Sequence, residues 1–72
     1  MEFSKQIKAI RNRYHYTQAF VAERLCMEKS TYARIEIGKT RLSVDVLIQL
    51  SRMYGVDLYD VIGLDRDDHL PY

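Results

Sequence analysis

The sequence has few of the residues that interrupt or cross-link a chain. It holds one proline and three glycines in 72 residues, so most of the chain is expected to be helical. Its single cysteine, Cys26, excludes an internal disulfide and suits a reducing cytoplasm. A chain of this length is expected to form one small domain.

Long hydrophobic segments are also missing. No apolar run approaches the roughly 20 residues that a membrane-spanning helix requires, which excludes a membrane span. Residues 1–13 lack the apolar core of a secretion signal. At 47% hydrophobic and 29% charged residues, the composition is that of a globular domain and not of a disordered chain. We therefore expect a cytoplasmic protein.

Positive and negative charges are separated along the chain. Residues 1–41 hold nine Lys or Arg and four Asp or Glu, a balance of +5, whereas residues 42–72 hold two and six, a balance of −4, which together give the net charge of +1. A domain polarised in this way can present a basic face to a polyanion. An ordinary solvated surface explains the asymmetry equally well.

Helical spacing of apolar residues predicts five helices joined by short loops, and no strand. The positions expected to face inward are Phe3, Ile7, Ile10 and Tyr14, then Phe20, Val21 and Leu25, then Tyr32 and Ile35, and then Val44, Leu47, Ile48 and Leu50. A short fifth helix is expected to begin at Asp57 and to cover Leu58 to Ile62. The expected fold class is all-α, a compact five-helix domain over residues 1–64. Residues 65–72 are acidic and are expected to form a loose tail.

Four expected helix starts share one pattern. A capping residue is flanked by apolar residues one position before it and four positions after it, the arrangement called the hydrophobic staple. The capping residues are Thr17, Glu28, Ser43 and Asp57. Gly55 is expected to end the fourth helix in a left-handed conformation.

The third helix, within the sequence EKSTYARIEIGK of residues 28–39, has two unlike sides. On a helical wheel Tyr32 and Ile35 form the buried side, flanked by Thr31 and Glu36. The opposite arc holds two cations, a hydroxyl, a small residue and an apolar residue, namely Lys29, Arg34, Ser30, Ala33 and Ile37. Such a set suits a surface with phosphates at its edges and hydrogen-bonding bases between them.

The stretch QAFVAERLCMEKSTYARI, residues 18–35, resembles the helix-turn-helix of the phage-repressor family, which includes Cro-like and xenobiotic-response-element proteins. The positions that match the family pattern are Gln18, Ala22, Leu25, Met27, Tyr32 and Ile35. The ending RIEIGK of residues 34–39 and the segment SVDVLIQLSRMYGVDLYDVIG of residues 43–63 are also similar to that family. The resemblance therefore covers nearly the whole chain and implies a five-helix fold like that of lambda repressor.

The resemblance also implies a function, that of a sequence-specific transcriptional regulator of double-stranded DNA. We expect a repressor that acts as a homodimer on a two-fold site, with the third helix in the major groove. The implied base-reading residues are Lys29, Ser30, Ala33 and Arg34. The implied phosphate-binding residues are Arg11, Gln18, Thr31, Lys39, Thr40 and Arg41. The dimer contact is expected in the acidic half, around Met53, Tyr54, Tyr59 and Ile62.

Three positions depart from the family pattern, and at one of them Leu42 stands where proline is frequent, with little functional consequence. Cys26 stands in the turn where glycine is usual, and a left-handed backbone there would cost about 1 kcal/mol. We expect its thiol to pack against other residues and not to act as a redox switch. Ile37 replaces a polar residue, and as an exposed apolar side chain it could contact a thymine methyl group or a partner protein.

The sequence shows no catalytic, metal or cofactor site. His15 and His69 are isolated, Cys26 has no partner at metal-ligand spacing, and no glycine-rich phosphate loop occurs. We therefore expect no enzyme activity, no cofactor and no small-molecule substrate.

Two alternatives stay open. The chain could be a protein-interaction module of the same fold, such as an antitoxin-like or scaffold protein that does not read DNA. Ile37 and the six tyrosines favour this alternative, because tyrosine is common in interfaces. The 72 residues could also be one domain of a longer regulator.

Overall fold

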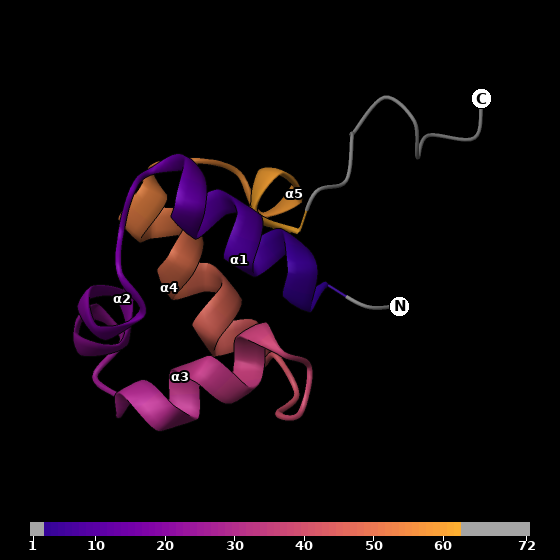
Figure 1. Cartoon of the computed structure of the whole chain (residues 1–72). Helices are drawn as coiled ribbons and strands as arrows, with labels where there is room; N and C mark the ends of the chain where they lie inside the picture. The colour runs from indigo at the N-terminus through magenta and orange to yellow at the C-terminus, as the bar shows by residue number, and fades with distance from the viewer. Residues whose placement is uncertain (1–2, 63–72) are drawn as a thin grey trace.

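The computed structural model describes residues 3–62, and within them the chain forms five helices and no strand (Figure 1). The helices are α1 Ser4–Arg13, α2 Gln18–Arg24, α3 Lys29–Glu36, α4 Val44–Tyr54 and α5 Leu58–Val61. The predicted all-α fold is confirmed. The predicted domain end at residue 64 and the acidic tail of residues 65–72 lie outside the described residues. No helix of the described part is long and apolar enough to cross a membrane.

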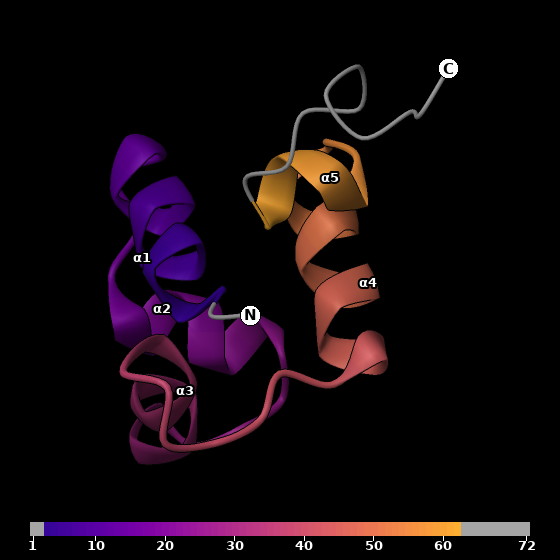
Figure 2. The ribbon, with the colours of Figure 1, turned by 90° about the vertical axis from the view of Figure 1, so that its right-hand side faces the viewer.

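The helix α3 lies at one edge of the domain. It packs against α2 and α1, whereas α5 packs against α4 and α1. Views at right angles to each other both place α3 at the end of the molecule away from α5 (Figures 1 and 2). The domain therefore covers one side of α3 and leaves the opposite side open.

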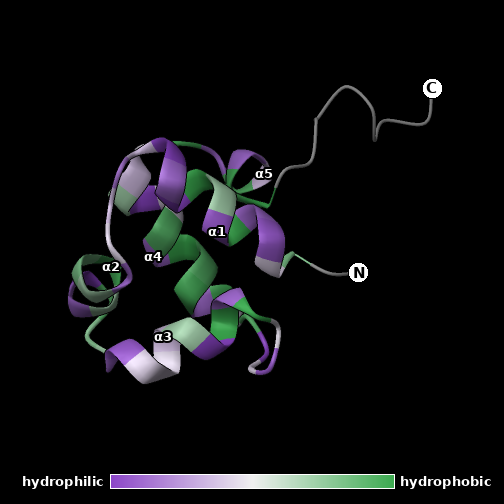
Figure 3. Ribbon diagram, viewed as in Figure 1, coloured by the Kyte–Doolittle hydropathy of each residue, from purple (hydrophilic) through white to green (hydrophobic). Residues whose placement is uncertain are grey.

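Side chains from all five helices meet in one core. Figure 3 shows α4 as hydrophobic along much of its length, whereas the start of α3 is hydrophilic. The buried members of the core are Ile7, Ile10, Val21, Ala22, Leu25, Tyr32, Leu50, Tyr54 and Val61. Most of the predicted inward-facing positions are therefore confirmed.

Three predicted core positions, Tyr14, Phe20 and Val44, are wrong, and the Tyr14 side chain is 37% exposed. The Phe20 side chain is 40% exposed, because it packs at the surface against the Tyr16 ring at a centroid distance of 4.6 Å. Val44 is 68% exposed. Val44 is the first residue of α4, and α5 lies beside the other end of that helix, so α5 does not cover Val44 (Figure 2).

The helix starts follow the predicted capping pattern. The Thr17 hydroxyl accepts a hydrogen bond from the Phe20 N–H at 3.0 Å, and the Ser43 hydroxyl accepts one from the Val46 N–H at 3.2 Å. Glu28 and Asp57 occupy their cap positions without a side-chain cap bond. This is expected for Glu28, which is a weak cap, but not for Asp57. The residues that precede the four caps all pack against the core, and they are Tyr16, Met27, Leu42 and Val56.

Four helices end in the same way, with a residue of positive φ. These residues are His15 (60°), Cys26 (57°), Gly38 (80°) and Gly55 (69°). At the second of them, the Cys26 N–H donates to the Glu23 carbonyl and the Met27 N–H donates to the Ala22 carbonyl, both at 3.0 Å. This is the Schellman motif, and the same bond spacing recurs at the other three ends.

The left-handed conformation is thus confirmed at Gly55 and is present at Cys26. It was not predicted at His15, although histidine is one of the non-glycine residues enriched in this region. The expectation that the Cys26 thiol packs against other residues is wrong, because Cys26 is exposed. Its side chain projects from the turn between α2 and α3.

We expect Cys26→Gly to raise the free energy of unfolding by up to about 1 kcal/mol. Glycine adopts a positive φ without steric cost, although its larger unfolded-state entropy offsets part of the gain. Cys26→Ala is the matched control, since it removes the exposed thiol and keeps the Cβ, and its stability should match that of the wild type. Urea unfolding measures all three. A glycine variant less stable than the alanine variant would contradict strain at this turn.

Candidate nucleic-acid interface

The open side of α3 carries the polar side chains that the helical wheel placed there. Lys29, Ser30 and Arg34 are exposed and Ala33 is half-buried, whereas Tyr32 and Ile35 face the core. Thr31, which the wheel placed beside the buried side, is also exposed. Within residues 3–62, the side chains of Lys29, Ser30 and Arg34 make no intramolecular hydrogen bond or ion pair. Their donors are therefore available to a partner.

The loop after α3 is folded back onto the end of the helix. Gly38, at φ 80°, lets the chain reverse, and the N–H groups of Lys39 and Thr40 both donate to the Arg34 carbonyl, at 2.9 and 3.2 Å. Lys39 and Arg41 are exposed and Thr40 is half-buried. The structure thus places the backbone of two predicted phosphate-binding residues directly beside a predicted base-reading residue.

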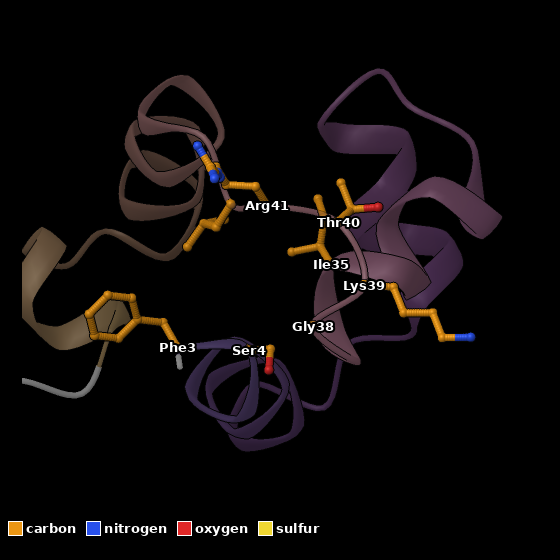
Figure 4. A pocket seen from close by; sticks show the side chains of 8 residues that line it. Phe3, Ser4, Ile35, Gly38, Lys39, Thr40 and Arg41 are labelled. Carbon is orange, nitrogen blue, oxygen red and sulfur yellow. The ribbon is translucent and has the colours of Figure 1, made fainter. Parts of the chain in front are cut away.

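A hollow lies between the start of α1 and this loop (Figure 4). Figure 4 shows Ile35 pointing toward the hollow and Lys39 pointing away from it. The residues that line it are Phe3, Ser4, Ile35, Gly38, Lys39, Thr40, Arg41 and Leu42. The Lys39 ammonium group is therefore presented to the outside and not to a ligand in the hollow.

A buried ion pair connects α1 to the last residue of α3. The Arg11 Nε donates to Glu36 Oε2 at 2.6 Å, and its Nη2 donates to Glu36 Oε1 at 3.1 Å. The third guanidinium nitrogen, Nη1, donates to the Tyr16 carbonyl at 2.8 Å. The exposed fraction of the side chain is 11% for Arg11 and 1% for Glu36.

This arrangement corrects the role expected for Arg11. The sequence placed it among the phosphate-binding residues, but all three nitrogens of its guanidinium group are engaged inside the domain. A buried charge requires such partners, because burial without them costs several kcal/mol. We therefore leave Arg11 out of the candidate DNA contacts.

Gln18 belongs to the same cluster. Its Nε2 donates to Glu36 Oε1 at 3.0 Å, so the first residue of α2 is bonded to the last residue of α3. The residue is half-buried and not fully exposed. The sequence indicated only that Glu36 flanks the buried side of its helix. A carboxylate at such an edge signals a buried partner, but which partner depends on how the helices pack.

The surroundings of Glu36 keep its carboxylate ionised. Burial acts to raise the pKa of Glu36, but the hydrogen bonds that it accepts, chiefly from Arg11, outweigh burial and hold the pKa below its usual value. Two phenol hydroxyls nearby, those of Tyr32 and Tyr54, are buried without a hydrogen-bond partner among the described residues. Burial raises the pKa of Tyr54 to about 12, and burial together with the Glu36 carboxylate raises the pKa of Tyr32.

Comparison with protein families places the chain by a match that covers most of its length. A family model described as helix-turn-helix matches residues 7–61, which run from α1 to the end of α5. The comparisons with curated proteins and with solved structures found no match. The matched span includes α3, the loop after it and the Arg11–Glu36 pair.

The lowered pKa of Glu36 predicts a loss of stability in acid. A carboxyl group whose pKa is lower in the folded state stabilises the fold above its unfolded-state pKa, and this contribution is lost as the pH falls through the folded-state value. We therefore expect the free energy of unfolding to decrease as the pH is lowered from about 4–5. Glu36→Gln should be less stable at pH 7 and should lose less stability in acid, since its side chain does not titrate.

Thermal unfolding from pH 7 to pH 3 tests this expectation. Glu23→Gln is the matched control, because Glu23 is exposed and its replacement should leave the pH dependence unchanged. If Glu36→Gln kept the acid sensitivity of the wild type, another group would be responsible for it.

Proposed function

Because the chain belongs to the phage-repressor, Cro-like helix-turn-helix family of DNA-binding regulators, we propose that it binds double-stranded DNA sequence-specifically and represses transcription. The observation that carries this proposal is the open side of α3, which lies at the edge of the domain and presents hydrogen-bond donors that have no partner among residues 3–62. In the proposed complex α3 lies in the major groove, where each base pair shows a distinct pattern of donors and acceptors.

The base-reading residues of the proposal are Lys29, Ser30, Ala33 and Arg34. Arg34 has a planar guanidinium group that can donate to both acceptors of a guanine edge. The nearby Glu36 carboxylate is paired with Arg11, and Arg34 makes no ion pair among the described residues. The small side chain of Ala33 allows the helix to approach the bases closely.

The phosphate-binding residues of the proposal are Gln18, Thr31, Lys39, Thr40 and Arg41. Lys39 and Arg41 are exposed in the loop that turns back at the end of α3, where a DNA backbone would pass. Contacts of this kind position the protein without selecting a sequence. The two groups of residues therefore have separable effects on binding.

We expect Arg34→Ala to lower the affinity for the preferred site by about 1–3 kcal/mol and to relax the preference at one base pair per half-site. Lys39→Ala should weaken binding to all sequences about equally and reduce the salt slope by about one unit for each phosphate that is no longer bound. Selection from random duplexes supplies the preferred site. Binding isotherms on that duplex and on a scrambled one, at several salt concentrations, then compare the variants.

The two substitutions act as controls for each other. If both variants lost affinity in parallel on both duplexes, Arg34 would be a phosphate contact only. If neither lost affinity, α3 would not be the reading helix.

The alternative, a protein-interaction module without DNA reading, is favoured by one observation. Ile37, at the end of α3, is 63% exposed, and an apolar side chain at this position suits a protein partner as well as a thymine methyl group. The same isotherms separate the two functions, because DNA binding through phosphates weakens steeply with salt. Absence of such binding in the wild type would favour the interaction module.

We further propose a homodimer formed through the α5 side of the domain. One module reads only a few base pairs, so the family's mode of binding uses two copies on a two-fold site. Of the residues expected at this contact, Tyr59 is exposed, and Met53 and Ile62 are half-buried. Tyr54 is buried in the core, so it is not part of the proposed dimer contact.

Sedimentation equilibrium tests the dimer. We expect the wild type to dimerise at high concentration or on a two-fold duplex, and we expect Tyr59→Asp to weaken dimerisation, because it places a charge in the contact. The two copies of α3 in the dimer should lie about 34 Å apart, which is one turn of DNA. Asp45→Asn, on an exposed residue of α4, is the control. A protein that stays monomeric with and without DNA would refute the proposal.

A further inference from the structure

One polar side chain of the proposed DNA face is held from inside the domain. The Gln18 Nε2 donates to Glu36 Oε1, and Glu36 is in turn held by two hydrogen bonds from Arg11. The carboxylate is almost fully buried, so it cannot turn to other partners in solvent. A bond to an ionised acceptor of this kind is about twice as strong as a bond between neutral groups.

Gln18 is the member of this cluster that reaches the surface. The other side chains that face the Glu36 carboxylate are Arg11 from α1, Tyr32 from α3 itself and Tyr54 from α4, and all three are buried. Gln18 alone among these described residues is half-exposed. Gln18 is therefore the side chain through which this cluster can contact a partner outside the domain directly.

The chemistry of the carboxamide leaves part of it free. A primary amide has two N–H donors and one carbonyl acceptor, and Glu36 takes one of the donors. Because the amide is planar, fixing one N–H also fixes the direction of the other. A glutamine side chain that is already ordered loses less rotamer freedom when it binds, which favours affinity.

We propose that Glu36, held by Arg11, is a positioning residue that orients the Gln18 carboxamide so that its second N–H binds a DNA phosphate. This inference rests on the proposed function and adds to it a residue that does not touch DNA. It gives the ion pair a second role besides joining α1 to α3. Affinity for DNA then depends on a buried carboxylate.

A double-mutant cycle on DNA affinity tests the proposal. Gln18→Ala should weaken binding about 3- to 10-fold on preferred and scrambled duplexes alike, as expected for one lost hydrogen bond to a charged group. In the Glu36→Gln background, the same substitution should weaken binding by less than about 2-fold, since the carboxamide is no longer fixed by a charged acceptor. Gln49→Ala, at an exposed glutamine of α4, is the control and should change nothing.

The side-chain amide resonances of Gln18 give a second measurement that needs only the wild type. When duplex DNA is added, we expect the chemical shift of the amide proton bonded to Glu36 to stay the same and that of the other amide proton to change. If neither proton shifted, or if Gln18→Ala had equal effects in both backgrounds, the positioning role would be refuted. If the wild type failed to bind duplex DNA at low salt, the proposed function itself would be refuted, so the two failures are distinguishable.

Discussion

The ion pair between Arg11 and Glu36 is the constraint on which the rest of the structure depends. It joins the first helix to the last residue of the third across the core, and it does so with nearly every polar atom bonded. A buried pair of this kind adds little net stability over an apolar contact, because desolvation offsets most of the attraction. Its geometry is nevertheless strict, since removing either partner leaves an uncompensated charge and costs about 3–5 kcal/mol.

The pair therefore fixes the position of α3. Apolar contacts such as those of Tyr32 and Ile35 bury the inner side of α3, but they tolerate small rotations and shifts better than a bidentate ion pair does. With Glu36 held by α1 and bonded to Gln18 of α2, the end of α3 is connected to both of its neighbours. The open side of the helix, whose donors have no partner in the described part of the chain, is presented in one orientation.

The helix ends contribute to the same result. Four helices end in a Schellman motif, and three of the motifs are followed directly by a residue that packs against the core, namely Tyr16, Met27 and Val56. The chain can thus reverse direction in a few residues, which keeps the loops short. At α3 the same motif brings the backbone of Lys39 to the Arg34 carbonyl, so the loop that carries the Lys39 cation starts beside the side of the helix that is proposed to read DNA.

The sequence alone determined the number of helices, their caps, the left-handed end at Gly55 and the polar arc of α3. These features depend on local interactions, namely side-chain periodicity, bonds within three or four residues and backbone sterics. Only the tertiary structure decided that Arg11 is buried with Glu36, that Phe20 and Val44 stay exposed and that Gln18 is bonded from within. Arg11 and Glu36 are 25 residues apart in the chain. No local pattern specifies which of several cations a buried carboxylate will meet, because that choice is made by the packing of the helices.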